Sequence, residues 1–255
     1  MKSIAWDIWL YWNYDCKFCS SKTSIVPKEI IGKEKIIDAW KKVYDKYGRC
    51  RIYITGGEPF LYPDFYDIIS NLLKFHDLHI TTNLSFTIKD FINLKVDKKS
   101  IFINATFHPF YQEIQDFISK ISILKKEGYL VSATYMSDDM QMTEAINYKK
   151  VFVDNNIDFS VVETDCKETV NNTIKNYLID GFVKEEKFFY ENNDKNFCNA
   201  GYKYLIVNNL GEVFVCSMDK NKIGNLFSDG LSFYPEKNRC KKNCILSEKK
   251  YYWGK

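Results

Sequence analysis

The sequence predicts an α/β protein: a partial (β/α)6 barrel followed by a small C-terminal cysteine-rich β-hairpin domain. Three observations lead to this prediction. Strand-like apolar runs alternate with helical stripes through the first two-thirds of the chain, and short strands without helices follow. Cysteines gather near both ends of the chain. About six strand–helix units fall short of the eight that close a full barrel, so we expect an open one.

Each expected strand or helix has the hydrophobic periodicity of its type. The expected barrel strands are short apolar runs at 4–11, 51–55, 78–82, 101–107, 129–136 and 157–163. The helices between them carry apolar residues three and four apart, at 36–44, 65–73, 88–94, 114–124 and 143–153. Asp64 is placed to cap the second helix, and Gly128 to end the fourth. This alternation favours a parallel sheet with crossover helices.

The pattern changes near residue 198. Two strand-like runs, 204–207 and 212–215, flank Asn208-Asn209-Leu210-Gly211, which has the composition of a hairpin turn. The preceding segment is polar and helix-prone. We therefore expect three parts, a barrel domain over 1–166, a connector over 167–197 and a cysteine-rich domain over 198–255.

The composition indicates a folded protein without a strongly charged partner. Hydrophobic residues make up 45% and charged residues 27%, and the net charge is +3. That charge is too small to argue for nucleic acid or an anionic membrane. No run approaches the ~20 apolar residues of a membrane span, and the N-terminus lacks a signal-peptide core. We expect no nucleic-acid or membrane partner and a cytoplasmic location, where clustered cysteines are more often ligands than disulfides.

Four C-terminal cysteines are predicted to form one metal site. Cys198 and Cys216 stand in a C-x12-G-x4-C arrangement, and Cys240 and Cys244 in C-x3-C. A hairpin can hold the first two sulfurs at its base, while a short loop supplies the others. Their Lys- and Asn-rich surroundings disfavour four unrelated buried thiols. Zinc and a 4Fe–4S cluster fit equally well by ligand number, and an iron–sulfur cluster is the interpretation we favour.

A second cysteine group follows the first expected strand directly. It reads Trp12-Asn13-Tyr14-Asp15-Cys16-Lys17-Phe18-Cys19 and resembles the cluster-binding loop of the radical S-adenosylmethionine (SAM) superfamily, C-x3-C-x2-C. Cys16 and Cys19 match the second and third cysteines, and Trp12 stands in the place of the first. Gly56-Gly57-Glu58-Pro59 matches the family's GGEP motif, whose backbone and acid hold the methionine amino group.

Three further features extend the resemblance over nearly the whole chain. Thr82-Asn83 ends the third strand, where the family often has Thr-Asn, and Thr106-Phe107-His108-Pro109 is similar to its Ser-x-His-Pro variants. The C-terminal cysteine hairpin resembles the auxiliary-cluster extension called a twitch domain, the shorter relative of SPASM. The resemblance implies a site for SAM, a C-terminal 4Fe–4S cluster at the four cysteines, and a second cluster at Cys16 and Cys19. The SAM-site residues it implies are Trp12, Gly56, Gly57, Glu58, Pro59, Asn83 and Thr106.

The departure at Trp12 changes the ligand chemistry of the loop. Indole has one N–H donor and no lone pair for a metal, so two irons of a four-iron cluster would lack protein ligands. Cys50 begins the second strand, roughly 20 Å from the site end, and is discarded as a replacement. Cys166, at the end of the last barrel strand, and Asp15 stay as candidates, although a partly buried thiol and a loop-orienting acid are the readings we favour for them.

Trp12 itself has two interpretations. Its ring either fills the volume that a cluster would occupy or stacks on a purine or substrate there. An engineered Trp12 also stays open, because Trp12→Cys would restore the motif in one change. His108 either faces the ligand site or is a hydrogen-bonded structural histidine, which is the commoner case.

Two functions follow from the resemblance. In the first, which we favour, a reduced cluster cleaves SAM to a 5′-deoxyadenosyl radical that abstracts hydrogen from a substrate. The auxiliary cluster accepts an electron, as in dehydrogenation, and a flavodoxin or ferredoxin supplies one. The substrate, a small molecule, sugar or peptide, is not readable. In the second, a degenerate member keeps the C-terminal cluster and acts as a binding or partner protein, or as a non-radical enzyme. Retention of Cys16, Cys19 and the GGEP segment favours the enzyme.

Overall fold

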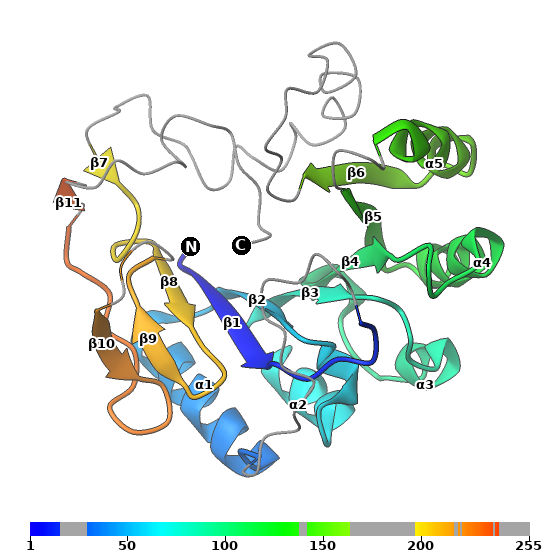
Figure 1. Cartoon of the computed structure of the whole chain (residues 1–255). Helices are drawn as coiled ribbons and strands as arrows, with labels where there is room; N and C mark the ends of the chain where they lie inside the picture. The colour runs from blue at the N-terminus through cyan, green and yellow to red at the C-terminus, as the bar shows by residue number, and fades with distance from the viewer. Residues whose placement is uncertain are drawn as a thin grey trace.

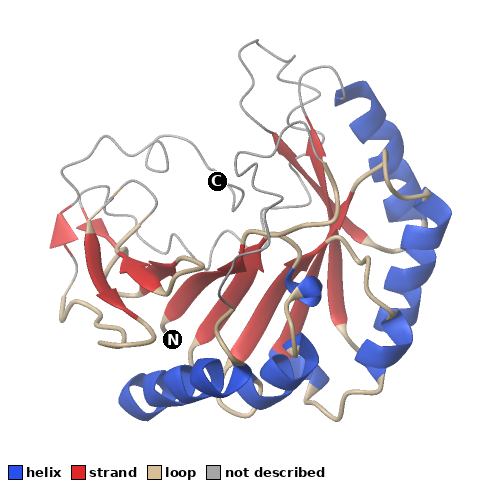
Figure 2. Cartoon of the chain, turned by 60° about the horizontal axis from the view of Figure 1, so that its bottom comes forward, coloured by secondary structure: helices blue, strands red, loops and turns tan. Residues whose placement is uncertain are grey.

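The computed structural model describes residues 1–15, 30–137, 142–163, 197–216, 219, 221–236 and 238–239. Within them a nine-stranded sheet has the order β10-β9-β8-β1-β2-β3-β4-β5-β6, and β11 pairs with β7 in a two-stranded sheet. The large sheet curves around an open side, with the helices along its outer face (Figures 1 and 2). This arrangement confirms the predicted α/β partial barrel, which leaves one face of the sheet concave.

The barrel part consists of parallel strands, each bonded to the next along the chain. They are β1 (Ser3–Trp9), β2 (Arg51–Gly56), β3 (Asp77–Thr82), β4 (Ile101–Phe107), β5 (Leu130–Ser137) and β6 (Asp158–Glu163). Each lies where the sequence predicts a strand. Their carboxyl ends therefore share one edge of the sheet, as parallel pairing requires.

The helices occupy the predicted intervals. They are α1 (Lys33–Tyr47), α2 (Phe65–Leu72), α3 (Ile88–Ile92), α4 (Ile114–Lys126) and α5 (Met142–Asp154), with short 3-10 turns η1 (Pro59–Leu61) and η2 (Lys98–Ser100). Gly128, at φ 90°, closes α4 as predicted by donating its N–H to Lys125 O at 3.0 Å. Asp64 precedes α2 but makes no capping hydrogen bond. Its backbone is left-handed (φ 56°), whereas a capping residue is usually extended, and its carboxylate forms an ion pair with Lys33 at 3.7 Å.

Strand residues of one parity form the core between sheet and helices. Trp6 of β1 contacts Trp40 of α1, with ring centroids 5.3 Å apart, and Ile52, Ile54 and Ile80 are fully buried. Because side chains alternate along a strand, the residues between them face the concave side. That set includes Asp7, Tyr53, Thr55, His79, Thr81, Phe102, Asn104, Ser132 and Thr134.

The C-terminal strands extend the same sheet beyond β1. β8 (Tyr204–Val207) runs parallel to β1 and forms an antiparallel hairpin with β9 (Glu212–Phe214), while β10 (Lys222–Asn225) completes the edge. Gly211, at φ 78°, donates its N–H to Asn208 O at 2.9 Å in the hairpin turn. The hairpin is where the sequence predicts it, but it continues the barrel's sheet. The division into three parts stays a prediction, since residues 167–196 of the predicted connector 167–197 lie outside the described residues.

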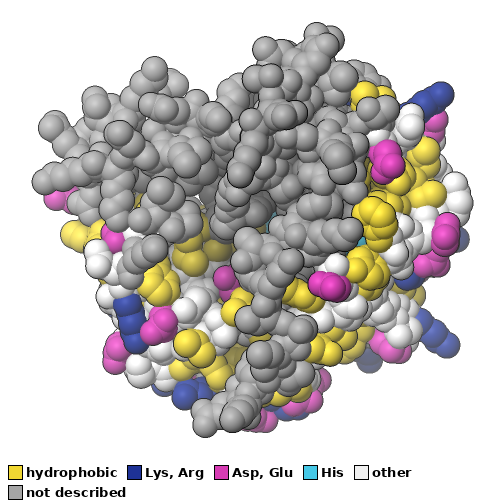
Figure 3. Space-filling view, viewed as in Figure 1, with side chains coloured by type: hydrophobic (Ala, Val, Ile, Leu, Met, Phe, Trp, Pro, Cys, Tyr) yellow, Lys and Arg dark blue, Asp and Glu magenta, His cyan; other side chains and the backbone are white. Residues whose placement is uncertain are grey.

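Two small strands lie near the predicted C-terminal metal site. β7 (Phe197–Cys198) pairs antiparallel with β11 (Asn238–Arg239), which brings the backbone of Cys198 opposite Asn238. Over the described ranges, the helices are all too short or too polar to cross a bilayer. Basic and acidic side chains are interspersed over the described part of the face in Figure 3.

Candidate active site

Backbone hydrogen bonds join the carboxyl ends of β1 and β2. The N–H of Gly57 donates to Trp9 O and that of Glu58 to Tyr11 O, both at 2.8 Å. A Cβ at Gly56 would lie 2.1 Å from Trp9 O, and one at Gly57 only 1.8 Å from Tyr11 O. Only glycine permits this approach. The GGEP segment is therefore fixed against the start of the loop that carries Trp12.

Glu58 is the buried acid of this edge, with 1% of its surface exposed. Its Oε1 accepts hydrogen bonds from Thr82 Oγ1 at 2.8 Å and from Phe60 N at 3.1 Å, and its Oε2 accepts one from Asn83 N at 2.8 Å. Burial raises the pKa of Glu58 to about 7, although these three bonds act in the opposite direction. A carboxylate has about four acceptor positions, so capacity for about one further donor is left.

Asn83 connects this acid to the N-terminal loop. Its Nδ2 donates to Asn13 Oδ1 at 2.9 Å, and its carbonyl accepts from Gln112 Nε2 at 2.5 Å. Gln112 Oε1 in turn accepts the N–H of His108 at 3.1 Å. The end of β3 thus meets Asn13, the residue that follows Trp12, and Gln112 links the end of β4 to Asn83. Sequence reasoning missed Gln112, which belongs to no motif.

An aromatic pair positions the backbone before Cys16. The rings of Tyr14 and Tyr111 stack at 4.6 Å and 4°, and Tyr111 Oη donates to Asp15 O at 2.7 Å and accepts from Asp15 N at 3.1 Å. The imidazole of His108 meets Tyr14 edge-on at 5.4 Å. Burial lowers the pKa of His108 to about 4, so the ring is neutral at pH 7. Both tyrosines were missed from the sequence, where only their aromatic character marked them.

The structure brings most of the predicted SAM-site residues to one edge. Gly56, Gly57, Glu58 and Asn83 meet there through the contacts above, and Trp12 stands in the adjoining loop between Tyr11, which bonds Glu58, and Asn13, which bonds Asn83. The remaining ones are Pro59, buried at the start of η1, and Thr106, near the end of β4.

The predicted metal ligands are placed only in part. The described residues include a free, partly buried Cys216 thiol and the backbone of Cys198. Cys16, Cys19, Cys166, Cys240 and Cys244 lie outside the described residues.

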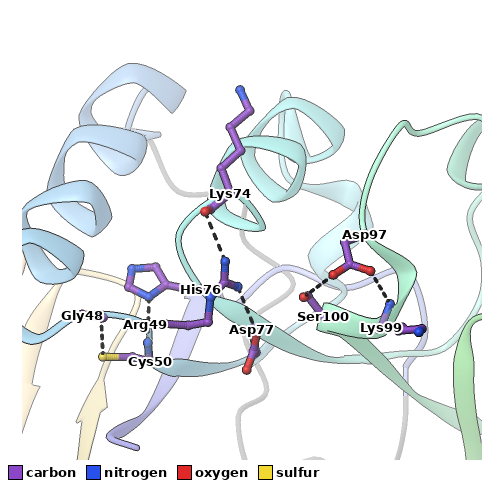
Figure 4. Close-up of polar contacts among 9 residues, drawn as sticks. All are labelled: Gly48, Arg49, Cys50, Lys74, His76, Asp77, Asp97, Lys99 and Ser100. Carbon is purple, nitrogen blue, oxygen red and sulfur yellow. Dashed lines mark hydrogen bonds and ion pairs between the residues drawn. The ribbon is translucent and has the colours of Figure 1, made fainter.

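Cys50 has a structural role at the opposite edge of the sheet (Figure 4). Its N–H donates to His76 Nδ1 at 3.2 Å, and its thiol donates to Gly48 O at 3.4 Å. Since Nδ1 accepts, the proton of His76 is on Nε2, which donates to Trp40 O at 3.0 Å. Burial raises the pKa of the Cys50 thiol to about 11. Its position at the amino end of β2 agrees with its exclusion as a ligand.

The donor set does not match a three-thiolate cluster. Trp12 is half-buried, and within the described part of the chain its indole forms neither a hydrogen bond nor a ring contact. The loop offers Cys16 and Cys19 by sequence, which is one thiolate too few. Among the described residues, no group of three or more His, Cys, Asp or Glu side chains could hold a metal. The edge fits the amino-acid part of SAM better, because Glu58 retains acceptor capacity for an ammonium group.

A parallel partial barrel with GGEP at its carboxyl edge defines a class of protein. A family model described as the Radical SAM superfamily matches residues 13–129. The matched residues make up less than half of the chain, and over them the chain is similar to this superfamily.

Individual relatives then resemble different lengths of the chain. An S-adenosylmethionine-dependent nucleotide dehydratase of Flammeovirga pacifica is 26% identical over 89% of this chain and 85% of its own length. A probable GTP 3',8-cyclase of Archaeoglobus fulgidus is 37% identical over 28% of this chain. The match spans only 24% of that cyclase.

Two solved structures share the fold at low identity. Streptococcus suis SuiB bound to precursor peptide SuiA gives a TM-score of 0.66 at 15% identity, over 90% of this chain and 63% of that one. Native anSMEcpe with bound AdoMet gives 0.65 at 12% identity, over 89% and 78%. At these identities the likeness establishes the fold alone.

Proposed function

We propose that the protein is a SAM-binding enzyme of the radical SAM type, which acts on a small molecule or peptide held at the concave face of the sheet. The observation that carries this proposal is Glu58. Its carboxylate is buried at the carboxyl edge, bonded to Thr82 and Asn83, and retains capacity for one more donor. A SAM ammonium group is a donor of the required charge.

The comparisons support the same proposal. The dehydratase of Flammeovirga pacifica, similar over most of both chains, is SAM-dependent by name. Its name and the cyclase names point to nucleotides, whereas the structural neighbours SuiB and anSMEcpe have peptides bound. The substrate class of the present chain is therefore argued from its own residues below.

The cluster supplies the electron that cleaves SAM in this family. The present chain would hold it through Cys16 and Cys19 and one further donor, and we assign no step to it because Trp12 removes the first thiolate. A flavodoxin or ferredoxin is the proposed electron donor. Trp12 is also the observation that favours the second candidate, a SAM-fold protein without radical chemistry.

Iron counting separates the two candidates. We would purify the full chain anaerobically and compare iron and sulfide with Cys16→Ala/Cys19→Ala and with Trp12→Cys. About eight irons in the wild type, falling to about four in the double variant, support the radical enzyme. About four in both, rising to about eight only in Trp12→Cys, would leave the second candidate. SAM binding by calorimetry, lost in Glu58→Ala, tests the SAM site independently of iron.

We further propose that Cys198, Cys216, Cys240 and Cys244 hold an auxiliary 4Fe–4S cluster. The pairing of β7 with β11 supports this, because β11 ends at Arg239, next to Cys240 in the chain. The free thiol of Cys216 supports it as well. Cys216→Ser should remove iron and leave the Cys16/Cys19 site unchanged. Zinc in place of iron in the purified protein would argue for a structural zinc site instead.

A further inference from the structure

A row of polar side chains crosses the concave face from strand to strand. β1 and β2 pair Asp7 with Thr55, and the register of β2 with β3 makes Thr81 the next neighbour. β4 and β5 continue the row with Asn104 and Ser132. These side chains point away from the helices, because residues of the other parity fill the core. The row is therefore a polar surface inside the partial barrel.

The two ends of this row differ in their hydrogen bonding. At the β4–β5 end the groups satisfy one another: Asn104 Oδ1 accepts from Thr134 Oγ1 at 2.6 Å and from Ser132 Oγ at 3.4 Å. Thr134 also bonds Ser160 at 3.1 Å. At the β1–β2 end, Asp7, Thr55 and Thr81 make no side-chain hydrogen bond or ion pair within the described part of the chain. The side chains that could still form hydrogen bonds with a ligand are therefore those at the β1–β2 end.

Asp7 is the charged group of the free end. Asp7 lies in the middle of β1. Its neighbours Trp6 and Ile8 are buried on the helix side, whereas Asp7 points to the concave side and is half-buried. Burial raises its pKa to about 6, as expected for a desolvated carboxylate that has no partner among the described residues. A ligand that donates a hydrogen bond to this carboxylate would offset its desolvation.

An aromatic row lies one step deeper on the same face. Tyr53 is paired with His79, and His79 with Phe102. The imidazole of His79 lies 4.9 Å from the Tyr53 ring and 4.2 Å from the Phe102 ring. Burial and, to a smaller extent, the positive charge of Arg51 lower the pKa of His79 to about 3, so the three rings of this row are neutral at pH 7. Below the carboxylate there is thus an aromatic surface suited to an apolar ring.

We propose that Asp7 determines substrate specificity by accepting a hydrogen bond from a protonated amine on a cyclic small-molecule substrate. The amine would lie beside Thr55 and Thr81, with the substrate ring over Tyr53 and His79. A carboxylate favours a cation over a phosphate. Arg51, a cation of this face, belongs to the deepest row, where its backbone is in register with Ser3. The inference rests on the proposed function only in that it takes the concave face to be the substrate side.

Matched probes test the charge preference on the full-length protein. Cyclohexylammonium and cyclohexanol differ in the amine, and phenyl phosphate supplies a ring with the opposite charge. Binding at pH 8 would be measured by ligand-observed NMR titration. We expect cyclohexylammonium to bind about tenfold more tightly than cyclohexanol, since a charge-assisted hydrogen bond is typically worth about that factor. Asp7→Asn should reduce the ratio to about one.

Asp158→Asn is the matched control, because this exposed acid ends the same row at β6 and should leave the ratio unchanged. If Asp7→Asn does not fold, Asp7→Ser, a residue type already present in the row, replaces it. Equal binding of the amine and the alcohol, a preference that survives loss of Asp7, or tighter binding of phenyl phosphate would overturn the inference. SAM binding measured on the same samples tests the proposed function separately, because it depends on Glu58 and not on Asp7.

Discussion

At the scale of single residues, Glu58 shows how position controls the chemistry of an acid. The end of β3 and the 3-10 turn η1 direct three donors at its carboxylate, while its burial opposes ionisation. Burial is the stronger effect, because the folded-state pKa is about 7 against 4.5 for the free side chain, so the neutral and ionised forms are about equally populated at pH 7. Asp7 is a second acid whose pKa is raised, to about 6, without any bonds that oppose the shift.

The raised pKa values predict a pH dependence of stability. The folded state binds protons that the unfolded state has released, so stability falls as pH rises from about 4 to 7. Glu58 alone would contribute about 3 kcal/mol to this fall. Denaturant unfolding between pH 4 and pH 8 measures it. Asp7→Asn should flatten the curve between pH 4 and pH 6 and stabilise the protein at pH 7, and an unchanged curve would contradict the environment described for Asp7.

At the scale of elements, the central position of β1 organises the molecule. β1 pairs with β2 on one side and β8 on the other, and its carboxyl end leads into the loop of Trp12. The glycines of the GGEP segment permit the close approach of that end. At the amino end, Lys2 Nζ donates to Tyr202 O at 2.7 Å and lies 4.1 Å from the centre of the Phe233 ring.

Gly57→Ala should disrupt the carboxyl edge. The added Cβ would lie 1.8 Å from Tyr11 O, so the loop must shift, and we expect destabilisation by about 2 kcal/mol or more. SAM binding should weaken in parallel, as measured by calorimetry. Gly32→Ala is the control, since its Cβ would meet only Glu34 Oε2, at 3.6 Å. Equal stability of the two variants would show that the close approach does not matter.

Lys2→Met should weaken the junction between the N-terminal and C-terminal strands. Methionine keeps the apolar stem but loses the hydrogen bond to Tyr202 O and the cation–π contact. We expect a loss of about 1–2 kcal/mol in unfolding free energy, measured by urea titration. Lys42→Met serves as the comparison, because Lys42 pairs only with Asp38 on the exposed face of α1. Similar losses for both would refute the assigned role of Lys2.

At the scale of the whole molecule, the C-terminal hairpin is part of the barrel's sheet. β8 covers the edge of β1, and Leu205, Val207 and Val213 are fully buried in the shared core. An uncovered β1 edge would expose unpaired backbone groups and apolar surface, which promotes aggregation. The large sheet therefore continues past residue 198, where the cysteine pattern predicts the start of the C-terminal domain.

Truncation tests this continuity. A chain of residues 1–166, the barrel domain that the sequence predicts, should lack cooperative thermal unfolding or precipitate, because the β1 edge is uncovered. Circular dichroism melting of this fragment and of the full chain measures the difference. A fragment that melts cooperatively and stays monomeric would instead support an independent barrel domain.

The sequence by itself determined the local features of this protein. The hydrophobic periodicity located the strands and helices, and the GGEP segment indicated the edge of the sheet that holds the candidate site, because these signals lie within a few consecutive residues. The cysteine ligand sets stay predictions. Tertiary structure decided what depends on distant pairs: β8 beside β1, Tyr111 against Asp15, Gln112 bonded to Asn83, and Asp7 without a partner among the described residues. Such contacts join segments up to 200 residues apart, as Lys2 and Tyr202 show, and no local pattern encodes which distant group a side chain will meet.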